Sequence, residues 1–200
     1  FMRVMDDLLR PHQDYSGAYI DDVAVYSMSW FEHIKHIRAV LQEFSNVGMT
    51  LRLSKASFAK PSAQFLGNVV GSGSRSIVQE KVTTIQAVPE PCTKKSLRGF
   101  LGMCGFYRTY IPRFAELALE LTNMTKKEQS NSIRFNEKQR AAFLGMKRAL
   151  CEAASLHIPD SSKPYILRTD ASATCASACL AQLDSLGAER PIAFMSAKFS

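Results

Sequence analysis

Two adjacent acidic residues, Asp21 and Asp22, lie between two short apolar runs, and this pattern constrains the fold more than any other stretch of the chain. The runs 18–20 and 23–25 are rich in strand-forming residues, so the sequence predicts a β-hairpin with both aspartates at its tip. An Asp-Asp pair lacks the glycine that two-residue hairpin turns favour, and adjacent carboxylates repel each other. A divalent cation such as Mg²⁺, which prefers oxygen ligands, would offset that repulsion. The pair therefore predicts either a metal site for phosphoryl chemistry or an exposed acidic turn.

Composition sets limits on the fold and on the partners. The chain has 200 residues, of which 46% are hydrophobic, which is enough for one domain or two small ones. Its formal charge of +7 favours a polyanionic partner such as nucleic acid. The sequence has no apolar run long enough to cross a bilayer, no signal-peptide pattern and no Cys-x-x-Cys motif among its five cysteines. We therefore expect an intracellular protein with reduced thiols and no membrane partner.

The first half of the chain carries two predicted helices. Residues 1–10 place apolar side chains at helical spacing, and Pro11 ends that run. Because the chain begins inside this helix and without Met, we expect it to be a piece of a longer protein. The stretch 29–32 is a capping-box pattern that begins a second amphipathic helix. His33 and His36 lie on adjacent turns of that helix and are interpreted as surface histidines, because no further zinc ligands accompany them.

Strands are predicted on both sides of a helical middle section. In the first half, alternating apolar residues predict a strand over 49–53, and the stretch 64–70 is interpreted as another strand. The last part of the chain contains three further predicted strands, over 165–170, 179–181 and 192–194. The helices between these two groups of strands make the predicted fold class α+β, with two separate sheet regions.

The helix that follows Thr93 has a glycine at every third position, at Gly99, Gly102 and Gly105. Each glycine costs about 1 kcal/mol relative to alanine in a helix interior, so the stripe needs a structural or functional reason. Two alternatives remain open. The glycines allow either another helix or a nucleic-acid backbone to approach closely.

Five groups of short motifs occur along the chain in a fixed order: Tyr19-Ile20-Asp21-Asp22, Gly48-Met49-Thr50-Leu51 with Ser54-Lys55, Phe65-Leu66-Gly67, Phe100-Leu101-Gly102 with Phe106-Tyr107-Arg108, and Thr169-Asp170-Ala171-Ser172. In this order and at this spacing, they resemble the polymerase of long-terminal-repeat retrotransposons of the Ty3/gypsy type over essentially the whole chain. In that family a Tyr-x-Asp-Asp hairpin lies in the palm of the reverse transcriptase.

The resemblance implies a layout for the α+β chain. It comprises the C-terminal part of a reverse transcriptase palm, a helical thumb, a connection, and the first strands of an RNase H-like domain. The implied bounds are 1–70 for the palm, 71–127 for the thumb, 128–163 for the connection and 164–200 for the RNase H-like part.

The resemblance also implies roles for individual residues. Asp21 and Asp22 would bind Mg²⁺ for nucleotide addition to a primer 3′-hydroxyl by two-metal catalysis. Lys55 would protonate the leaving pyrophosphate, and its alternative is an ordinary exposed lysine. The residues implied to contact the template–primer are Tyr19 in the hairpin and Phe65, Leu66 and Gly67 in the primer grip. The spacing of Gly99, Gly102 and Gly105 makes these glycines further candidates for nucleic-acid contact, with helix packing as the alternative.

In the RNase H-like part, Asp170 would be the first of the metal-binding acids. The chain departs from the family pattern at Cys175 and Ser177, which stand where glycines are usual. The remaining acids of both metal sites belong, in the family, to segments on either side of this chain. We therefore expect the isolated chain to catalyse neither reaction.

The implied parent protein is an RNA-directed DNA polymerase with an attached RNase H-like domain. It would act on RNA or DNA template–primers and deoxynucleoside triphosphates, in a cytoplasmic particle or in the nucleus. The alternative is a non-catalytic nucleic-acid-binding remnant of a decayed element. Intact Asp21 and Asp22 favour the polymerase, whereas the changes at Cys175 and Ser177 permit the remnant.

Overall fold

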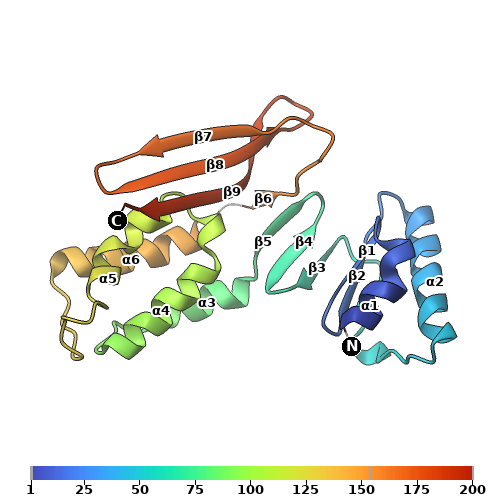
Figure 1. Ribbon diagram of the computed structural model, residues 1–200, viewed down its shortest axis with the longest axis horizontal. Helices are drawn as coiled ribbons and strands as arrows, with labels where there is room; N and C mark the ends of the chain where they lie inside the picture. The colour runs from blue at the N-terminus through green and yellow to red at the C-terminus, as the bar shows by residue number, and fades with distance from the viewer. Residues whose placement is uncertain (1, 154, 200) are drawn as a thin grey trace. The chain divides into compact units, whose positions relative to one another are not determined.

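The computed structural model describes residues 2–153 and 155–199 and has the α+β class predicted from the sequence (Figure 1). The chain divides into two compact units, Phe1–Phe65 and Leu66–Ser200, which are described separately below. Within the described residues, no helix is both long enough and apolar enough to cross a membrane.

The first unit contains the predicted hairpin between two helices. Pro11 lies in the 3₁₀ turn that follows the first helix, and Ser29 begins the second by accepting a hydrogen bond from the backbone N–H of Glu32 at 3.3 Å. The elements in chain order are α1 (Met2–Leu9), η1 (Arg10–His12), β1 (Ser16–Tyr19), β2 (Asp22–Val25), α2 (Trp30–Asn46), η2 (Leu53–Lys55) and β3 (Ser62–Phe65).

A small core holds these elements together. Its fully buried members are Met5 and Leu9 from α1 and Val40 and Phe44 from α2. Side chains from one face of the hairpin, including Val23, pack against this core. The hairpin therefore has an inner face on the core and an outer face in solvent, as the alternation of side chains along a strand requires.

The strand predicted over 49–53 is wrong. Those residues form no strand, and the 3₁₀ helix η2 begins at Leu53. Leu51 and Leu53 remain 44% and 71% exposed, so their alternating pattern does not bury a face. Strand propensity reflects packing on a pleated, half-buried surface, and these residues lack such a surface in the structure.

The second unit begins with strands and helices that surround a larger core. The elements in chain order are β4 (Asn68–Gly71), β5 (Ser74–Ile77), α3 (Gln79–Ala87), α4 (Lys94–Phe106), η3 (Arg108–Tyr110), α5 (Phe114–Asn123), α6 (Glu137–Cys151), β6 (Leu156–His157), β7 (Ile166–Ala171), β8 (Cys175–Leu183) and β9 (Glu189–Lys198).

The predicted strand over 64–70 is wrong as a single element, because Leu66 and Gly67 adopt positive φ angles of 49° and 76° and form a turn between β3 and β4.

Antiparallel pairing organises the strands of this unit. β4, β5 and β6 pair in that order, and β7, β8 and β9 form a separate three-stranded sheet. The helices α4, α5 and α6 lie along one side of the β7–β9 sheet (Figure 1). The core between these layers includes Leu97, Phe100, Leu121 and Met146, each 1% exposed or less, and Phe194 of β9 packs against it.

Candidate active sites

Only one of the two aspartates lies in the loop of the β1–β2 hairpin, although the sequence predicts both at the tip. Tyr19 pairs with Asp22 at the last rung of the ladder, so the two-residue loop is Ile20-Asp21 and Asp22 is the first residue of β2. Ile20 has a φ of 56°, in the left-handed region that β-branched residues disfavour. The backbone is therefore strained at the residue next to the acidic pair, and such strain is concentrated at functional sites.

Both aspartates face solvent. Their side chains are exposed, and the neighbouring Tyr19 and Ile20 are each 49% exposed. Among residues 2–153 and 155–199, neither carboxylate takes part in an ion pair. Two adjacent, exposed carboxylates without a cationic partner fit the oxygen-ligand chemistry of Mg²⁺. In the described part of the chain they have no third metal-binding side chain beside them, so they supply only part of a ligand set.

Lys55 and Phe65 lie elsewhere in the first unit. Lys55 is the last residue of η2 and is exposed, and Phe65 is the last residue of β3 and is half-buried. The structure therefore presents Lys55 as an accessible ammonium group on a short helical turn.

The turn at Leu66 and Gly67 begins the second unit and is held in place by aromatic residues of that same unit. The Tyr107 hydroxyl donates to the carbonyl oxygen of Gly67 at 3.4 Å, and the Tyr110 hydroxyl donates to Oδ1 of Asn68 at 2.7 Å. A Cβ atom at Gly67 would lie 3.4 Å from the ring of Phe106. Burial raises the pKa of both tyrosine hydroxyls, so both remain protonated donors. The Phe106-Tyr107-Arg108 motif is visible in the sequence, but its anchoring role depends on tertiary contacts that the motif does not indicate.

The glycine stripe of α4 is open to solvent. A Cβ atom built at Gly99, Gly102 or Gly105 would meet no atom within 4 Å in the described residues. Among the residues that the structure describes, no other helix packs on the stripe, so the helix-packing alternative has no support here. The stripe is available for contact with a ligand.

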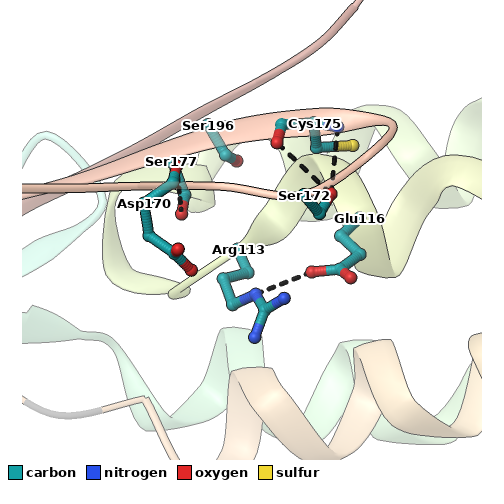
Figure 2. Close-up of a pocket in the computed structure, with 7 residues that line it drawn as sticks. All are labelled: Arg113, Glu116, Asp170, Ser172, Cys175, Ser177 and Ser196. Atoms are coloured by element: carbon teal, nitrogen blue, oxygen red, sulfur yellow. Dashed lines mark hydrogen bonds and ion pairs between the residues drawn. The ribbon is translucent and has the colours of Figure 1, made fainter.

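Asp170 lines a small cleft at the edge of the β7–β9 sheet (Figure 2). It pairs with Ser177 of β8, which in turn pairs with Ser196 of β9, so the three side chains form a row across the sheet. Arg113 and Glu116 of the α5 region line the same cleft, and Nε of Arg113 lies 2.7 Å from the Glu116 carboxylate. The cleft has a volume of about 10 Å³, room for about one water molecule.

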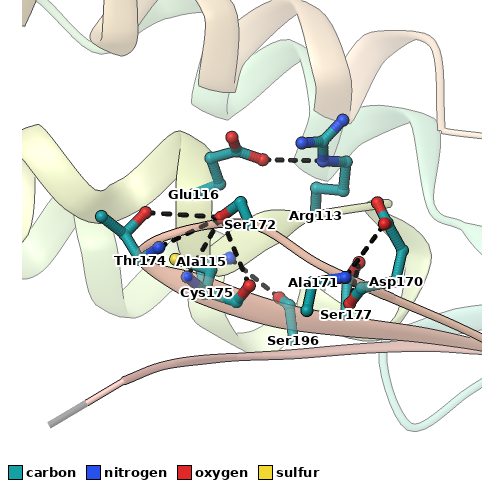
Figure 3. Close-up of polar contacts among 10 residues, drawn as sticks. All are labelled: Arg113, Ala115, Glu116, Asp170, Ala171, Ser172, Thr174, Cys175, Ser177 and Ser196. Carbon is teal, nitrogen blue, oxygen red and sulfur yellow. Dashed lines mark hydrogen bonds and ion pairs between the residues drawn. The ribbon is translucent and has the colours of Figure 1, made fainter.

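The N-terminus of α5 is attached to this sheet by a hydrogen bond (Figure 3). Arg113 occupies the N-cap position with a left-handed φ of 54°, and its side chain makes no capping hydrogen bond. The backbone N–H of Ala115 donates to Oγ of Ser196 at 2.8 Å. A serine 81 positions away along the chain thus satisfies one of the free N–H groups at the start of the helix. Sequence reasoning missed both Arg113 and Ser196.

The departures from glycine near Asp170 cause no backbone strain. Cys175 and Ser177 lie in β8 with ordinary strand conformations, and positive φ is absent at both positions. Ser172 closes the preceding turn, because its Oγ accepts the backbone N–H of Cys175 at 3.1 Å. His33 and His36, interpreted above as surface residues, are half-buried and both contact Ser27.

Comparisons with known proteins identify two family regions in the chain. Residues 1–70 match the family described as reverse transcriptase (RNA-dependent DNA polymerase). Residues 135–200 match the RNase H-like domain found in reverse transcriptase, and this match begins within the segment for which the sequence predicts a connection.

Relatives cover almost the whole chain. The Pol polyprotein of the Drosophila melanogaster transposon opus is 36% identical over 98% of the chain, and that of transposon gypsy is 35% identical over 91%. The Gag-Pol polyprotein of gibbon ape leukemia virus is 34% identical over 90% of the chain. The chain spans 20%, 19% and 10% of the lengths of these three relatives, respectively.

Solved structures share the fold. The foamy viral protease-reverse transcriptase dRH in complex with double-stranded DNA has a TM-score of 0.90 to this chain, and the foamy viral enzyme in complex with an RNA/DNA hybrid has a TM-score of 0.85. Both are 24% identical and cover 100% of this chain, which spans 35% and 27% of those chains, respectively. The resemblance to gypsy-type retrotransposons predicted from the motifs is confirmed by these findings. The chain therefore belongs to the reverse transcriptases of Pol polyproteins, with a reverse transcriptase region at residues 1–70 and an RNase H-like domain at residues 135–200.

Proposed function

We propose that the chain carries the metal-binding hairpin of an RNA-directed DNA polymerase, and that Asp21 and Asp22 contribute carboxylate ligands for nucleotide addition to a primer 3′-hydroxyl. The observation that carries the proposal is the exposed, unpaired Asp21-Asp22 pair beside a left-handed Ile20 in a reverse transcriptase region. Mg²⁺, when bound to such carboxylates, supplies charge stabilisation for phosphoryl transfer.

The other residues of the chain act on the nucleic acid. Tyr19, exposed beside the acidic pair, packs against the template–primer, and Lys55 donates a proton to the leaving pyrophosphate. The turn at Leu66 and Gly67, with Phe65 before it, holds the primer end in line with the incoming deoxynucleoside triphosphate. The open glycine stripe at Gly99, Gly102 and Gly105 lets the nucleic-acid backbone approach α4 closely.

We assign the four predicted parts as palm over 1–70, thumb over 71–127, connection over 128–163 and RNase H-like over 164–200. In this assignment Asp170 is a metal-binding acid of the RNase H-like part. The parent polypeptide acts inside the cell on RNA or DNA template–primers, and the isolated chain is inactive because each metal site needs further carboxylates. Two solved relatives are complexes with double-stranded DNA and an RNA/DNA hybrid, which supports the choice of nucleic-acid partner.

One observation favours a second candidate function for the RNase H-like part. Arg113 lines the cleft of Asp170, and in the described residues no third metal-binding side chain completes a site there. The Arg113 guanidinium group is paired with the Glu116 carboxylate at 2.7 Å, so Asp170 is, among the described residues, the one carboxylate of the cleft that remains for a cation, which is too few for two-metal chemistry. This arrangement supports a non-catalytic nucleic-acid-binding role, as in a remnant of a decayed element.

Primer extension tests the polymerase proposal. The chain, continued at both ends by its own reading frame, is assayed on an RNA template with Mg²⁺, beside the variant Asp21→Asn with Asp22→Asn. The matched control is Asp6→Asn with Asp7→Asn, which removes another adjacent acidic pair from α1. Extension that is lost only in the hairpin variant supports the proposal. A folded parent polypeptide without extension activity would point to the non-catalytic remnant.

A further inference from the structure

The hairpin that carries Asp21 and Asp22 needs support beyond its own ladder. It consists of two strands of four residues each, and an isolated two-stranded hairpin is marginally stable in water. The small core of the first unit supports one face of the strands. The open end of the hairpin, opposite the acidic tip, is held by a different kind of contact.

Ser27, two residues after β2, lies between two imidazole rings of α2. Its Oγ is 2.7 Å from Nδ1 of His36 and 3.2 Å from Nδ1 of His33. All three side chains are half-buried. These contacts attach the segment that leaves β2 to the first turns of α2.

Tyr15, immediately before β1, attaches the other strand to the same place. Its ring stacks on His36, with centroids 3.7 Å apart and planes 8° from parallel. Its hydroxyl contacts Nδ1 of the buried His12, and its carbonyl oxygen accepts the backbone N–H of Tyr26 at 2.9 Å. The last contact extends the pairing of the two strands by one step below the ladder.

His12 completes the cluster at the first unit's core. Its carbonyl oxygen accepts hydrogen bonds from the backbone N–H of Tyr15 at 3.1 Å and from Oγ of Ser16 at 2.8 Å. Nε2 of His12 is buried without a hydrogen-bond partner in the described residues, and it faces the Glu43 carboxylate of α2 at 3.7 Å. The imidazole is thus held between the hairpin and α2.

We propose that His12, Tyr15, Ser27, His33 and His36 form a clamp that fixes the open end of the β1–β2 hairpin on α2 and thereby positions Asp21 and Asp22. These five are positioning residues, since they contact one another or the hairpin backbone and lie away from the acidic tip. The consequence for metal binding rests on the proposed function. The mechanical part of the proposal, that the clamp holds the hairpin, stands without it.

The two contacts of the Ser27 hydroxyl group restrict where the neutral imidazole rings of His33 and His36 can carry their protons. A hydroxyl group has one proton to donate and two lone pairs that accept. Ser27 can therefore donate to only one of the two Nδ1 atoms, so the other imidazole must carry its own proton on Nδ1. The clamp requires that at least one of His33 and His36 is protonated at Nδ1 even when neutral.

Nitrogen NMR of the imidazole rings in the 200-residue chain tests this restriction on the proton positions. Spectra are recorded at alkaline pH, where the imidazole resonances no longer shift with pH. We expect at least one of His33 and His36 to carry its proton on Nδ1. In Ser27→Ala this constraint disappears and the tautomer populations change. Both rings found with the proton on Nε2 in the unaltered chain would overturn the clamp.

Amide hydrogen exchange of the hairpin tests the mechanical part. In Ser27→Ala we expect the amides of the β1–β2 ladder to exchange about tenfold faster, the effect of losing one to two hydrogen bonds. Ser27→Thr, which keeps the hydroxyl, restores slow exchange, and the control Ser45→Ala on the exposed part of α2 has no effect. If Ser27→Ala does not fold, Tyr15→Phe keeps the stacked ring and should still speed exchange. Unchanged exchange in both variants overturns the proposal.

Metal binding by the same variants separates the clamp from the proposed function. Mn²⁺ is titrated into the chain, and the broadening of the Asp21 and Asp22 amide signals is followed. Ser27→Ala should raise the Mn²⁺ midpoint by up to about tenfold, as for residues that orient metal ligands, and Ser27→Thr should restore it. If Mn²⁺ broadens the Asp21 and Asp22 signals in neither the unaltered chain nor the variants, the proposed metal site is contradicted. The amide hydrogen exchange experiment then tests the clamp by itself. An unchanged midpoint in Ser27→Ala overturns the positioning role.

Discussion

The hairpin that carries Asp21 and Asp22 and the sheet that carries Asp170 present their carboxylates in opposite settings. The hairpin places two adjacent acids in solvent, on two short strands over a core of four buried residues. The sheet places Asp170 in a cleft that Arg113 and Glu116 also line, above a core with sixteen buried residues in the described part of the chain. In the described residues, the hairpin acids have no cationic partner, whereas the cleft acid has a guanidinium group among its neighbours.

This difference shows that two acidic motifs in one chain can differ in how well their surroundings suit a bound cation. The hairpin has paired negative charge and weak intrinsic stability, which suits a site that a cation completes. The cleft has polar contacts that are already satisfied by the protein, including the bond from Ala115 to Ser196. Its stability comes from the second unit's packing, and Arg113 is already paired with the Glu116 carboxylate, which leaves Asp170 as the one remaining carboxylate of the described residues in the cleft for a cation.

The largest expected effect comes from opening the larger core. Phe143 of α6 is 3% exposed and packs on Phe100 with ring centroids 4.6 Å apart. Phe143→Ala should lower the free energy of unfolding of the second unit by about 3–5 kcal/mol. Its neighbour Leu144 is 52% exposed, so Leu144→Ala is the matched control, with a small effect.

Thiol labelling measures this loss in the second unit alone, because all five cysteines lie there. Cys104 is fully buried, and burial raises the pKa of its thiol to about 12, so it reacts when the unit opens. Labelling of Cys104 should accelerate in Phe143→Ala, while amide exchange in the hairpin stays unchanged. Faster exchange in the hairpin as well would show that the two units do not unfold separately.

A smaller effect is expected from the hydrogen bond that attaches α5 to the sheet. Ser196→Ala leaves the N–H of Ala115 without its partner and should cost about 1 kcal/mol, as for the loss of a helix cap. Ser177→Ala is the control, since Ser177 lies in the same row and makes only a 3.5 Å contact to a carbonyl oxygen. Chemical denaturation of both variants measures the difference. Equal losses would mean that the bond to Ala115 has no special role.

The smallest effect concerns a carboxylate that does have a cationic partner. Hydrogen bonds from Arg190 and from the backbone N–H of Ala188 lower the pKa of Asp184, in the turn between β8 and β9. A lowered pKa means that the ionised group stabilises the turn above the ordinary pKa and that this contribution is lost as pH falls through the lowered value. The amide signals of Leu186 and Ala188 should therefore shift on acidification. Asp184→Asn should abolish the shift, and a shift that persists would contradict this assignment.

Short sequence patterns predicted those helix and strand features that are determined by residues adjacent in the chain. Ser29 and Thr93 were recognisable as caps, and both cap helices in the structure, α2 and α4. Short strand-forming runs predicted the strands of the β7–β9 sheet, and the pairing partners of these strands are present in the structure. Alternation failed at Leu51 and Leu53, because a strand also needs a pairing surface that the local pattern does not encode.

The candidate sites were predictable in part for the same reason. The acidic pair is contiguous, so the sequence displays it directly, although the turn begins one residue earlier, at Ile20. The stacking of Tyr15 on His36 and the bond from Ala115 to Ser196 join residues far apart in the chain. Tertiary packing alone brings such residues together, so a single sequence could indicate neither the clamp nor the attachment of α5.

The most direct test of the central claim is a Mn²⁺ titration of the 200-residue chain, read from the broadening of each backbone amide signal. We predict broadening centred on residues 20–22 and weaker broadening at Asp170, whose cleft contains Arg113. The variant Asp21→Asn with Asp22→Asn should abolish the hairpin signal, whereas Asp6→Asn with Asp7→Asn should leave it intact. Broadening centred on Asp170, or equal loss in both variants, would contradict the account of the hairpin as the metal-binding site.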